Sequence, residues 1–116
     1  MALVGQNFPD MDVEGINEMG DKININIFKK AKEEKKKILL FWYPKDFTFV
    51  CPTELHSFQE NLNEFENRNT IVIGASCDSA EVHFAWLNTP KDNGGIEGIS
   101  YDLIADTNRN LSSTLN

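Results

Sequence analysis

Four residues near position 50 are the ones whose types and spacing could do chemistry. In the stretch PKDFTFVCP, Cys51 follows Pro44 and Thr48 and is itself followed directly by Pro52. Proline is preorganised for the first turn of a helix, so we expect Cys51 at or next to the N-terminal cap of a helix. The unpaired amide groups and the positive end of the helix dipole would favour a thiolate over a thiol there.

A single activated thiolate suits attack on an electrophile. Peroxide is the simplest candidate, and the product would be a sulfenic acid. The Thr48 hydroxyl could donate to the sulfur or to a bound oxygen, and Pro44 would shield the pocket. The sequence has no CxxC, because Thr53 and Glu54 follow Pro52, so the second sulfur of a thioredoxin-type dithiol is missing. A buried structural cysteine is the alternative, but no packing requirement accounts for all four residues.

The other cysteine and the two histidines are expected to have structural roles. Together with Cys51 they lack the paired spacing of zinc ligands, so we predict no metal site and no cofactor. Cys77 is expected to be a small buried apolar residue, with a redox partner or an accidental disulfide as alternatives. His83 is expected to pack or to form a local hydrogen bond. His56 is expected at the surface, although it could tune the thiolate.

The elements that must position these residues alternate along the chain. The predicted strands are a short one near 11–13 and then 22–27, 38–43, 70–76 and 100–106, of which 22–27 could continue into the start of a helix. The predicted helices are 28–37, 53–67, one capped by Asp78 or Ser79, and a last one capped by Thr107 or Asn108. Such alternation gives a mainly parallel sheet with helices on its faces. Ligand chemistry in such sheets lies at the carboxyl ends of the strands.

Two segments on either side of Cys51 have clear patterns. Residues 38–43 (ILLFWY) show no polar alternation, which is typical of a central strand buried on both faces. Residues 53–67 form an amphipathic helix. Its core-facing stripe consists of residues at helical spacing, namely Leu55, Phe58, Leu62 and Phe65. Cys51 is therefore expected between a buried strand and a packed helix.

The bulk composition excludes several classes of protein. The chain has 116 residues, enough for one small domain, and its net charge of −7 argues against nucleic acid binding. The longest apolar run, residues 38–43, is too short to span a bilayer, and the N-terminus shows no secretory signal. Two cysteines are too few for a disulfide scaffold. We therefore expect a cytoplasmic protein with no membrane partner.

The stretch PKDFTFVCPTE resembles the active-site motif of the peroxiredoxins. The similarity is greatest to the typical 2-Cys group, which includes the alkyl hydroperoxide reductase C subunit. The motif Pro-x-x-x-Thr-x-x-Cys is met by Pro44, Thr48 and Cys51. Further similarity follows in VIGASCDS (72–79), HFAWLNTP (83–90) and GGIEGISYDLIADT (94–107). The resemblance covers nearly the whole chain and is weakest before Lys22.

The resemblance implies a fold and a set of residue roles. The fold would be a thioredoxin-like three-layer α/β domain with a mainly parallel central sheet and an N-terminal extension. Cys51 would be the peroxidatic cysteine, Thr48 would hydrogen-bond the peroxide, and Pro44 would close the pocket. Glu54 would help to fix a charged network at the site. Trp86 matches an aromatic position that serves packing.

The resemblance also implies partners. The sulfenic acid would be captured by a resolving cysteine of a partner subunit, and the disulfide would be reduced by thioredoxin or a dedicated flavoprotein. A homodimer or a ring of dimers is implied. The family's active-site arginine and resolving cysteine have no match here, because Arg109 and Cys77 lie elsewhere in the pattern. We therefore expect residues 1–116 to be a single domain that is incomplete at its C-terminal end.

The expected function is thiol-dependent reduction of hydrogen peroxide and organic hydroperoxides through Cys51. One alternative is a peroxiredoxin-like scaffold or holdase with little turnover, which the unmatched arginine favours. A second alternative is a thiol–disulfide oxidoreductase, and the absence of CxxC counts against it. Two smaller departures from the family pattern are Trp42, where Phe or Tyr is commoner, and Asp102, where Pro is usual.

Overall fold

The computed structural model describes residues 7–43 and 51–115, with only the backbone of residues 51 and 52. The strands are β1 (Asp12–Ile16), β2 (Lys22–Asn26), β3 (Lys37–Trp42), β4 (Thr70–Ser76) and β5 (Asp102–Ala105). The helices are α1 (Ile27–Glu34), α2 (Cys51–Glu60), α3 (Leu62–Asn67), α4 (Ala80–Leu87), the short 3-10 helix η1 (Lys91–Asn93) and α5 (Asn110–Leu115). No helix in these described parts is long and apolar enough to cross a membrane.

The sheet has the strand order β2-β1-β5-β4-β3 and is mixed. Strands β3, β4 and β5 are parallel, as expected from the alternating pattern. Strand β1 runs antiparallel to both β2 and β5. The expectation of a mainly parallel sheet therefore holds for only three strands. The connection between β1 and β2 is short, and a short connection can join only antiparallel strands.

Strand β3 does not lie where its sequence indicated. Residues 38–43 predicted a central strand, but among the described residues β3 pairs only with β4 and forms an edge of the sheet. The side chains of residues 38–41 are half-buried and Trp42 is exposed, and it is the neighbouring β4 whose residues 72–76 are buried. A run of apolar residues indicates that both faces are covered, and it carries no information about the position of the strand across the sheet.

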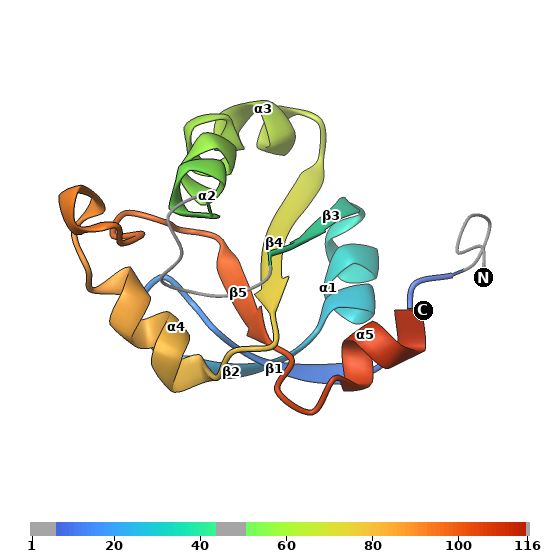
Figure 1. Cartoon of the computed structure of the whole chain (residues 1–116). Coiled ribbons are helices and arrows are strands. Elements are labelled where there is room, and N and C mark those ends of the chain that lie inside the picture. The colour runs from blue at the N-terminus through green and yellow to red at the C-terminus, as the bar shows by residue number, and fades with distance from the viewer. Residues whose placement is uncertain (1–6, 44–50, 116) are drawn as a thin grey trace.

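Helices cover both faces of the sheet and produce three layers (Figure 1). One core lies between the sheet and α2, α3 and α4, and its largest member is Trp86. The other core lies beneath α1 and α5, which contribute Ile27 and Leu111. Strand β3 serves both layers, since Leu39 and Phe41 pack against the first core while Ile38 and Leu40 pack against the second. This is the alternation that a pleated strand imposes.

Local hydrogen bonds set the helix boundaries. The predicted helix 53–67 is two helices, α2 and α3, separated at Asn61, whose side-chain amide donates to the Ser57 carbonyl. Helix α1 ends at Glu34, earlier than predicted, because Lys35 adopts the left-handed conformation with φ 55°. Ser79, one of the two predicted caps of α4, accepts from the Val82 amide. The Ser79 side chain thereby satisfies an amide group that the start of a helix leaves unpaired.

The last helix is held by a residue that the sequence did not single out. The Asp106 carboxylate accepts from the amides of Leu111 at 3.0 Å and Ser112 at 2.9 Å. Of the two predicted caps, Asn108 accepts from the Asn110 amide. Asp106 is almost fully buried, and its own amide donates to the Ser76 carbonyl. It therefore joins α5 to the end of β4.

Candidate active site

Cys51 is the first residue of α2, which confirms its predicted place at a helix start. It follows β3 through residues 44–50. The other residues of the predicted motif, Pro44 and Thr48, lie outside the described residues, as does the Cys51 side chain. Their arrangement around the sulfur stays a prediction. What the structure does show is how α2 and the end of β3 are held in place.

Helix α2 is held by polar contacts with residues that precede β5. The Tyr101 hydroxyl donates to the Leu55 carbonyl at 2.8 Å. The Gln59 side chain accepts from the Ser100 amide at 2.9 Å and also bonds the Ser100 hydroxyl. Burial raises the pKa of Tyr101 well above its usual value. A phenol kept neutral in this way remains a hydrogen-bond donor to the helix.

His56 lies on the same helix and is buried, so its expected surface position was wrong. Its Nε2 atom is 3.1 Å from the Gly95 carbonyl. Helical spacing could not reveal this contact, because Gly95 belongs to the loop after α4. His56 therefore belongs to the contacts that hold α2.

The apolar stripe of α2 and α3 packs on the sheet as predicted. Leu55 is fully buried. Phe58 stacks on Phe41 of β3, with ring centroids 4.2 Å apart and planes inclined by 15°. Leu62 and Phe65 are partly buried against the same core. An offset or stacked aromatic pair adds to the hydrophobic energy of burial, so the pair fixes α2 above β3.

Beyond the end of β3, a second polar cluster joins three elements. Tyr43 places its hydroxyl 3.3 Å from Nδ1 of His83 on α4, and Nε2 of His83 is 3.0 Å from the Ile104 carbonyl on β5. Trp86 is fully buried, and its indole nitrogen donates to the Gly94 carbonyl at 2.9 Å. The burial of His83 and Trp86 confirms their expected packing roles, whereas the side-chain hydrogen bonds of His83 are long-range and not local as expected.

The comparison with known proteins decides the family. Residues 4–116 match the model of the AhpC/TSA family. The chain belongs to the AhpC/TSA family. Its resemblance to the peroxiredoxins, noted from the motif around Cys51, is thereby confirmed.

Individual members of the AhpC/TSA family match along almost the whole chain. Alkyl hydroperoxide reductase C of Buchnera aphidicola is 42% identical over 111 residues, which are 96% of this chain and 55% of that protein. The chloroplastic 2-Cys peroxiredoxin BAS1 of Arabidopsis thaliana is 40% identical over 114 residues, 98% of this chain and 42% of that protein. The chain spans about half the length of the curated relatives it matches.

Solved structures of family members have the same fold. The reduced 2-Cys peroxiredoxin of Plasmodium vivax superposes with a TM-score of 0.88 at 35% identity, covering 97% of this chain and 68% of that one. AhpC of Enterococcus faecalis superposes with a TM-score of 0.83 at 31% identity, covering 99% of this chain and 65% of that one. The fold is the thioredoxin-like α/β fold that the motif implied.

Glu54 lies in the first turn of α2 and is exposed. A carboxylate at this place complements the positive end of the helix dipole. Among the ion pairs between described residues, none involves Glu54. Its predicted part in a charged network at the site stays a prediction.

Cys77 is exposed, so the expectation of a buried residue was wrong. It directly follows the buried β4, whose last residue is Ser76. Cys77 thus lies just beyond the strand, outside the part of β4 whose two faces are buried. The apolar character of β4 does not extend to its following residue.

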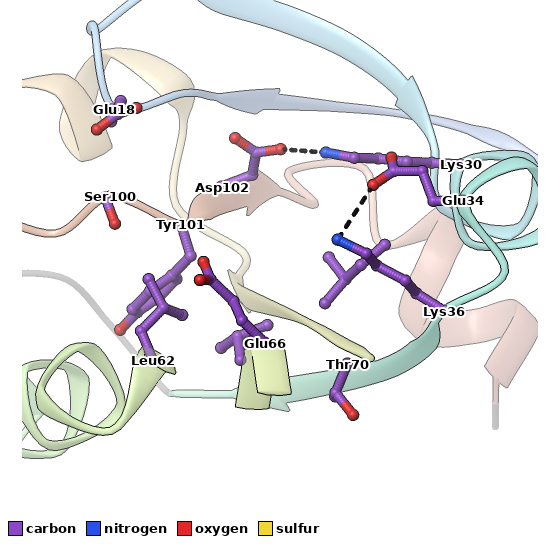
Figure 2. Close-up of a pocket in the computed structure, with 12 residues that line it drawn as sticks. Glu18, Lys30, Glu34, Lys36, Leu62, Glu66, Thr70, Ser100, Tyr101 and Asp102 are labelled. Atoms are coloured by element: carbon purple, nitrogen blue, oxygen red, sulfur yellow. Dashed lines mark ion pairs between the residues drawn. The ribbon is translucent and has the colours of Figure 1, made fainter. Parts of the chain in front are cut away.

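A cavity of about 290 Å³ is lined in part by Leu62, Ser100 and Tyr101, which also take part in the contacts of α2 and α3 (Figure 2). It opens at the amino ends of the parallel strands, where Thr70 begins β4 and Asp102 begins β5. Two ion pairs join residues that line it, Lys30 to Asp102 at 3.5 Å and Lys36 to Glu34 at 3.6 Å. Within the described ranges, no group of three or more His, Cys, Asp or Glu could hold a metal ion.

Proposed function

We propose that this AhpC/TSA chain is a thiol-dependent peroxidase that acts through Cys51. The observation that carries the proposal is the place of Cys51 as first residue of α2, after a parallel strand of a thioredoxin-like sheet. Amide groups at a helix start favour a thiolate. The thiolate attacks one peroxide oxygen, an S–O bond forms, and the O–O bond breaks. After proton transfer, the products are Cys51 sulfenic acid and water or an alcohol.

The residues near Cys51 in the sequence have proposed roles in this step. Thr48 hydrogen-bonds the bound peroxide, Pro44 closes the pocket against water, and Glu54 takes part in a charged network. Hydrogen peroxide and small organic hydroperoxides are the proposed substrates. Two features support these proposals, namely the match of the motif and membership of a family that includes alkyl hydroperoxide reductase C.

Recycling of the sulfenic acid needs a thiol reductant. We propose a thioredoxin-like protein or a flavoprotein disulfide reductase, and a homodimer or ring of dimers as the assembly. Among structural relatives, Prx1a of Plasmodium yoelii modified at its N-terminus forms an artifactual octamer. We propose a cytoplasmic location. Relatives are found in several places, since BAS1 is chloroplastic and a 2-Cys peroxiredoxin of Plasmodium falciparum is mitochondrial.

The test is the second-order rate of oxidation by hydrogen peroxide, measured on the reduced chain together with the stoichiometry of peroxide loss. We expect oxidation much faster than that of free cysteine, one peroxide consumed per Cys51, and complete loss in Cys51→Ser. Cys77→Ser is the matched control and should keep the full rate. A rate no greater than that of free cysteine would refute the peroxidase and leave a scaffold role.

A further inference from the structure

A buried imidazole joins three elements at the end of β3. His83 of α4 is fully buried, and its two ring nitrogens contact different strands. Nε2 is 3.0 Å from the Ile104 carbonyl of β5. Nδ1 is 3.3 Å from the hydroxyl of Tyr43, which directly follows β3. This Tyr43–His83–Ile104 chain therefore connects one helix to two strands that are not adjacent in the sheet.

The chemistry of the partners fixes the direction of the hydrogen bonds. A backbone carbonyl can only accept, so Nε2 of His83 carries the proton. In the neutral ring Nδ1 then presents a lone pair, and the Tyr43 hydroxyl donates to it. Both donors thus point along one line, from Tyr43 through His83 to Ile104. The ring is fixed in a single tautomer and a single orientation.

The backbone and the side chain of Tyr43 are both anchored. Its amide donates to the Ala75 carbonyl at 3.0 Å and so extends the pairing of β3 with β4. Its ring lies 5.7 Å from that of Trp86, at an angle of 45°, and only 4% of the residue is exposed. Pro44 follows directly in the sequence, and Cys51 comes eight residues after Tyr43. The anchored Tyr43 is therefore the last described residue after β3 before the chain reaches Cys51.

Burial of this polar chain has little value as a source of stability. A buried hydroxyl and imidazole lose their hydration, and their hydrogen bonds return only a small net gain. Apolar side chains would fill the same space without that cost. What the Tyr43–His83–Ile104 chain supplies is direction, because a hydrogen bond fixes orientation where apolar packing does not.

We propose that Tyr43 and His83 are positioning residues for the oxidation of Cys51. They fix the place and direction in which the backbone leaves β3, and thereby the approach of peroxide to the sulfur. The proposal rests on the peroxidase function proposed above. It assigns no contact between either side chain and the substrate.

The experiment uses the full chain carrying Cys77→Ser, so that Cys51 is the only thiol. Tyr43→Phe removes one hydroxyl and keeps the ring. His83→Gln keeps a donor for the Ile104 carbonyl and removes the acceptor at Nδ1. We expect each variant to lower the rate of oxidation by hydrogen peroxide about three- to tenfold, the equivalent of one hydrogen bond. The double variant should lose less than the product of the two single losses, because both variants break the same hydrogen bond.

Two further readouts separate positioning from general loosening of the fold. Alkylation of Cys51 by iodoacetamide, corrected for the thiolate fraction, should stay within about twofold in both variants, since simple alkylation needs no peroxide geometry. Asp106→Asn, which weakens the cap of α5 and leaves the Tyr43 and His83 side chains in place, is the control for stability loss and should keep the full peroxide rate. If the rates of peroxide oxidation and of alkylation fall together, the positioning role is refuted and Tyr43 and His83 only stabilise the fold. A reduced peroxide rate in Asp106→Asn would lead to the same conclusion.

The remaining outcomes distinguish this proposal from the proposed function. An unchanged rate in Tyr43→Phe overturns the positioning role and leaves the peroxidase intact. Nitrogen NMR of His83 tests the bonds without any reaction, and it should show a protonated Nε2 and an Nδ1 signal that moves in Tyr43→Phe. A proton on Nδ1 overturns the proposal even if Cys51 is a fast peroxidase. If the parent chain reacts no faster than free cysteine, the proposed function and this role fall together.

Discussion

Tyr101→Phe removes a single buried oxygen from the contacts that hold α2. The hydroxyl donates to the Leu55 carbonyl at 2.8 Å. The ring itself packs edge-to-face on Phe41, with centroids 5.7 Å apart and planes at 71°, and phenylalanine keeps that contact. The substitution therefore isolates one hydrogen bond between α2 and the segment before β5.

At neutral pH the expected cost is that of one hydrogen bond. Such a bond contributes about 1 kcal/mol net, so Tyr101→Phe should lower the free energy of unfolding by about that amount. In a domain of this size, the loss corresponds to a fall of about 4 °C in Tm. Tyr101→Ala, which also removes the ring, should cost about 3–5 kcal/mol.

The same hydroxyl makes stability depend on pH in the alkaline range. Burial raises the pKa of Tyr101 in the folded chain well above the value of about 10 that it has when unfolded. Above pH 10 the unfolded chain loses the phenolic proton and the folded chain keeps it. The unfolded state then binds fewer protons, so the free energy of unfolding falls by about 1.4 kcal/mol per pH unit. Below pH 10 the contribution is fully present.

The two effects predict a crossover. Tyr101→Phe lacks the hydrogen bond at every pH. It also has no phenol at position 101 to ionise, so its free energy of unfolding does not show the fall above pH 10 that Tyr101 causes in the parent. It should be the less stable protein at pH 8 and should equal the parent between about pH 10.5 and 11. Urea unfolding of both proteins at a series of pH values measures the difference between their free energies of unfolding. Groups that both proteins share, such as Tyr43 and the lysines, contribute equally and cancel in this difference. Parallel curves up to pH 11.5 would show that Tyr101 ionises normally in the folded chain, and the argument from burial would fail.

Two further changes test the packing of the sheet and the cap of α5. Gly15→Ala would place a methyl group 2.5 Å from the backbone oxygen of Leu103, so unfolding should show a loss of about 1–3 kcal/mol. In the control Gly74→Ala, the added methyl group meets only the ends of side chains, at 3.0 Å, so the loss of unfolding free energy should be smaller. Equal losses in the two variants would refute the distinction between backbone and side-chain contacts. Asp106→Ala removes the acceptor of two amides of α5 and should cost about 0.5–2 kcal/mol by denaturant titration, with Asp106→Asn in between. Identical stability of all three proteins would show that α5 does not need this cap.

Much of the architecture could be predicted from local patterns. Strand β4 has the bounds 70–76 that its apolar run predicted, and Ser79 caps α4 as its residue type suggested. The break at Asn61 was missed, because the apolar stripe continues across it and gives no sign of the side-chain bond from Asn61 to the Ser57 carbonyl. Apolar residues spaced at periods of 2 or 3.6 indicate which face of a strand or helix is buried. They do not indicate where one helix ends and the next begins.

Long-range contacts in the candidate site were beyond prediction. His56 and Gly95 are far apart in sequence, as are Tyr101 and Leu55, and nothing in either local pattern indicates the pairing. The exposed Cys77 shows the reverse case, in which an apolar residue type suggested burial and the end of β4 decided otherwise. Contacts of this kind follow from the packing of elements and not from residue type.

By itself the sequence determined the chemistry and the local elements. Cys51 before Pro52 places a thiol at a helix start, since the preference of proline for the first turn is a property of neighbouring residues. Only the tertiary structure decided that β3 lies at an edge and that β1 is inserted antiparallel beside β5. It also decided that Tyr43 and His83 meet. These facts depend on which surfaces bury each other, and that is settled by the whole chain at once.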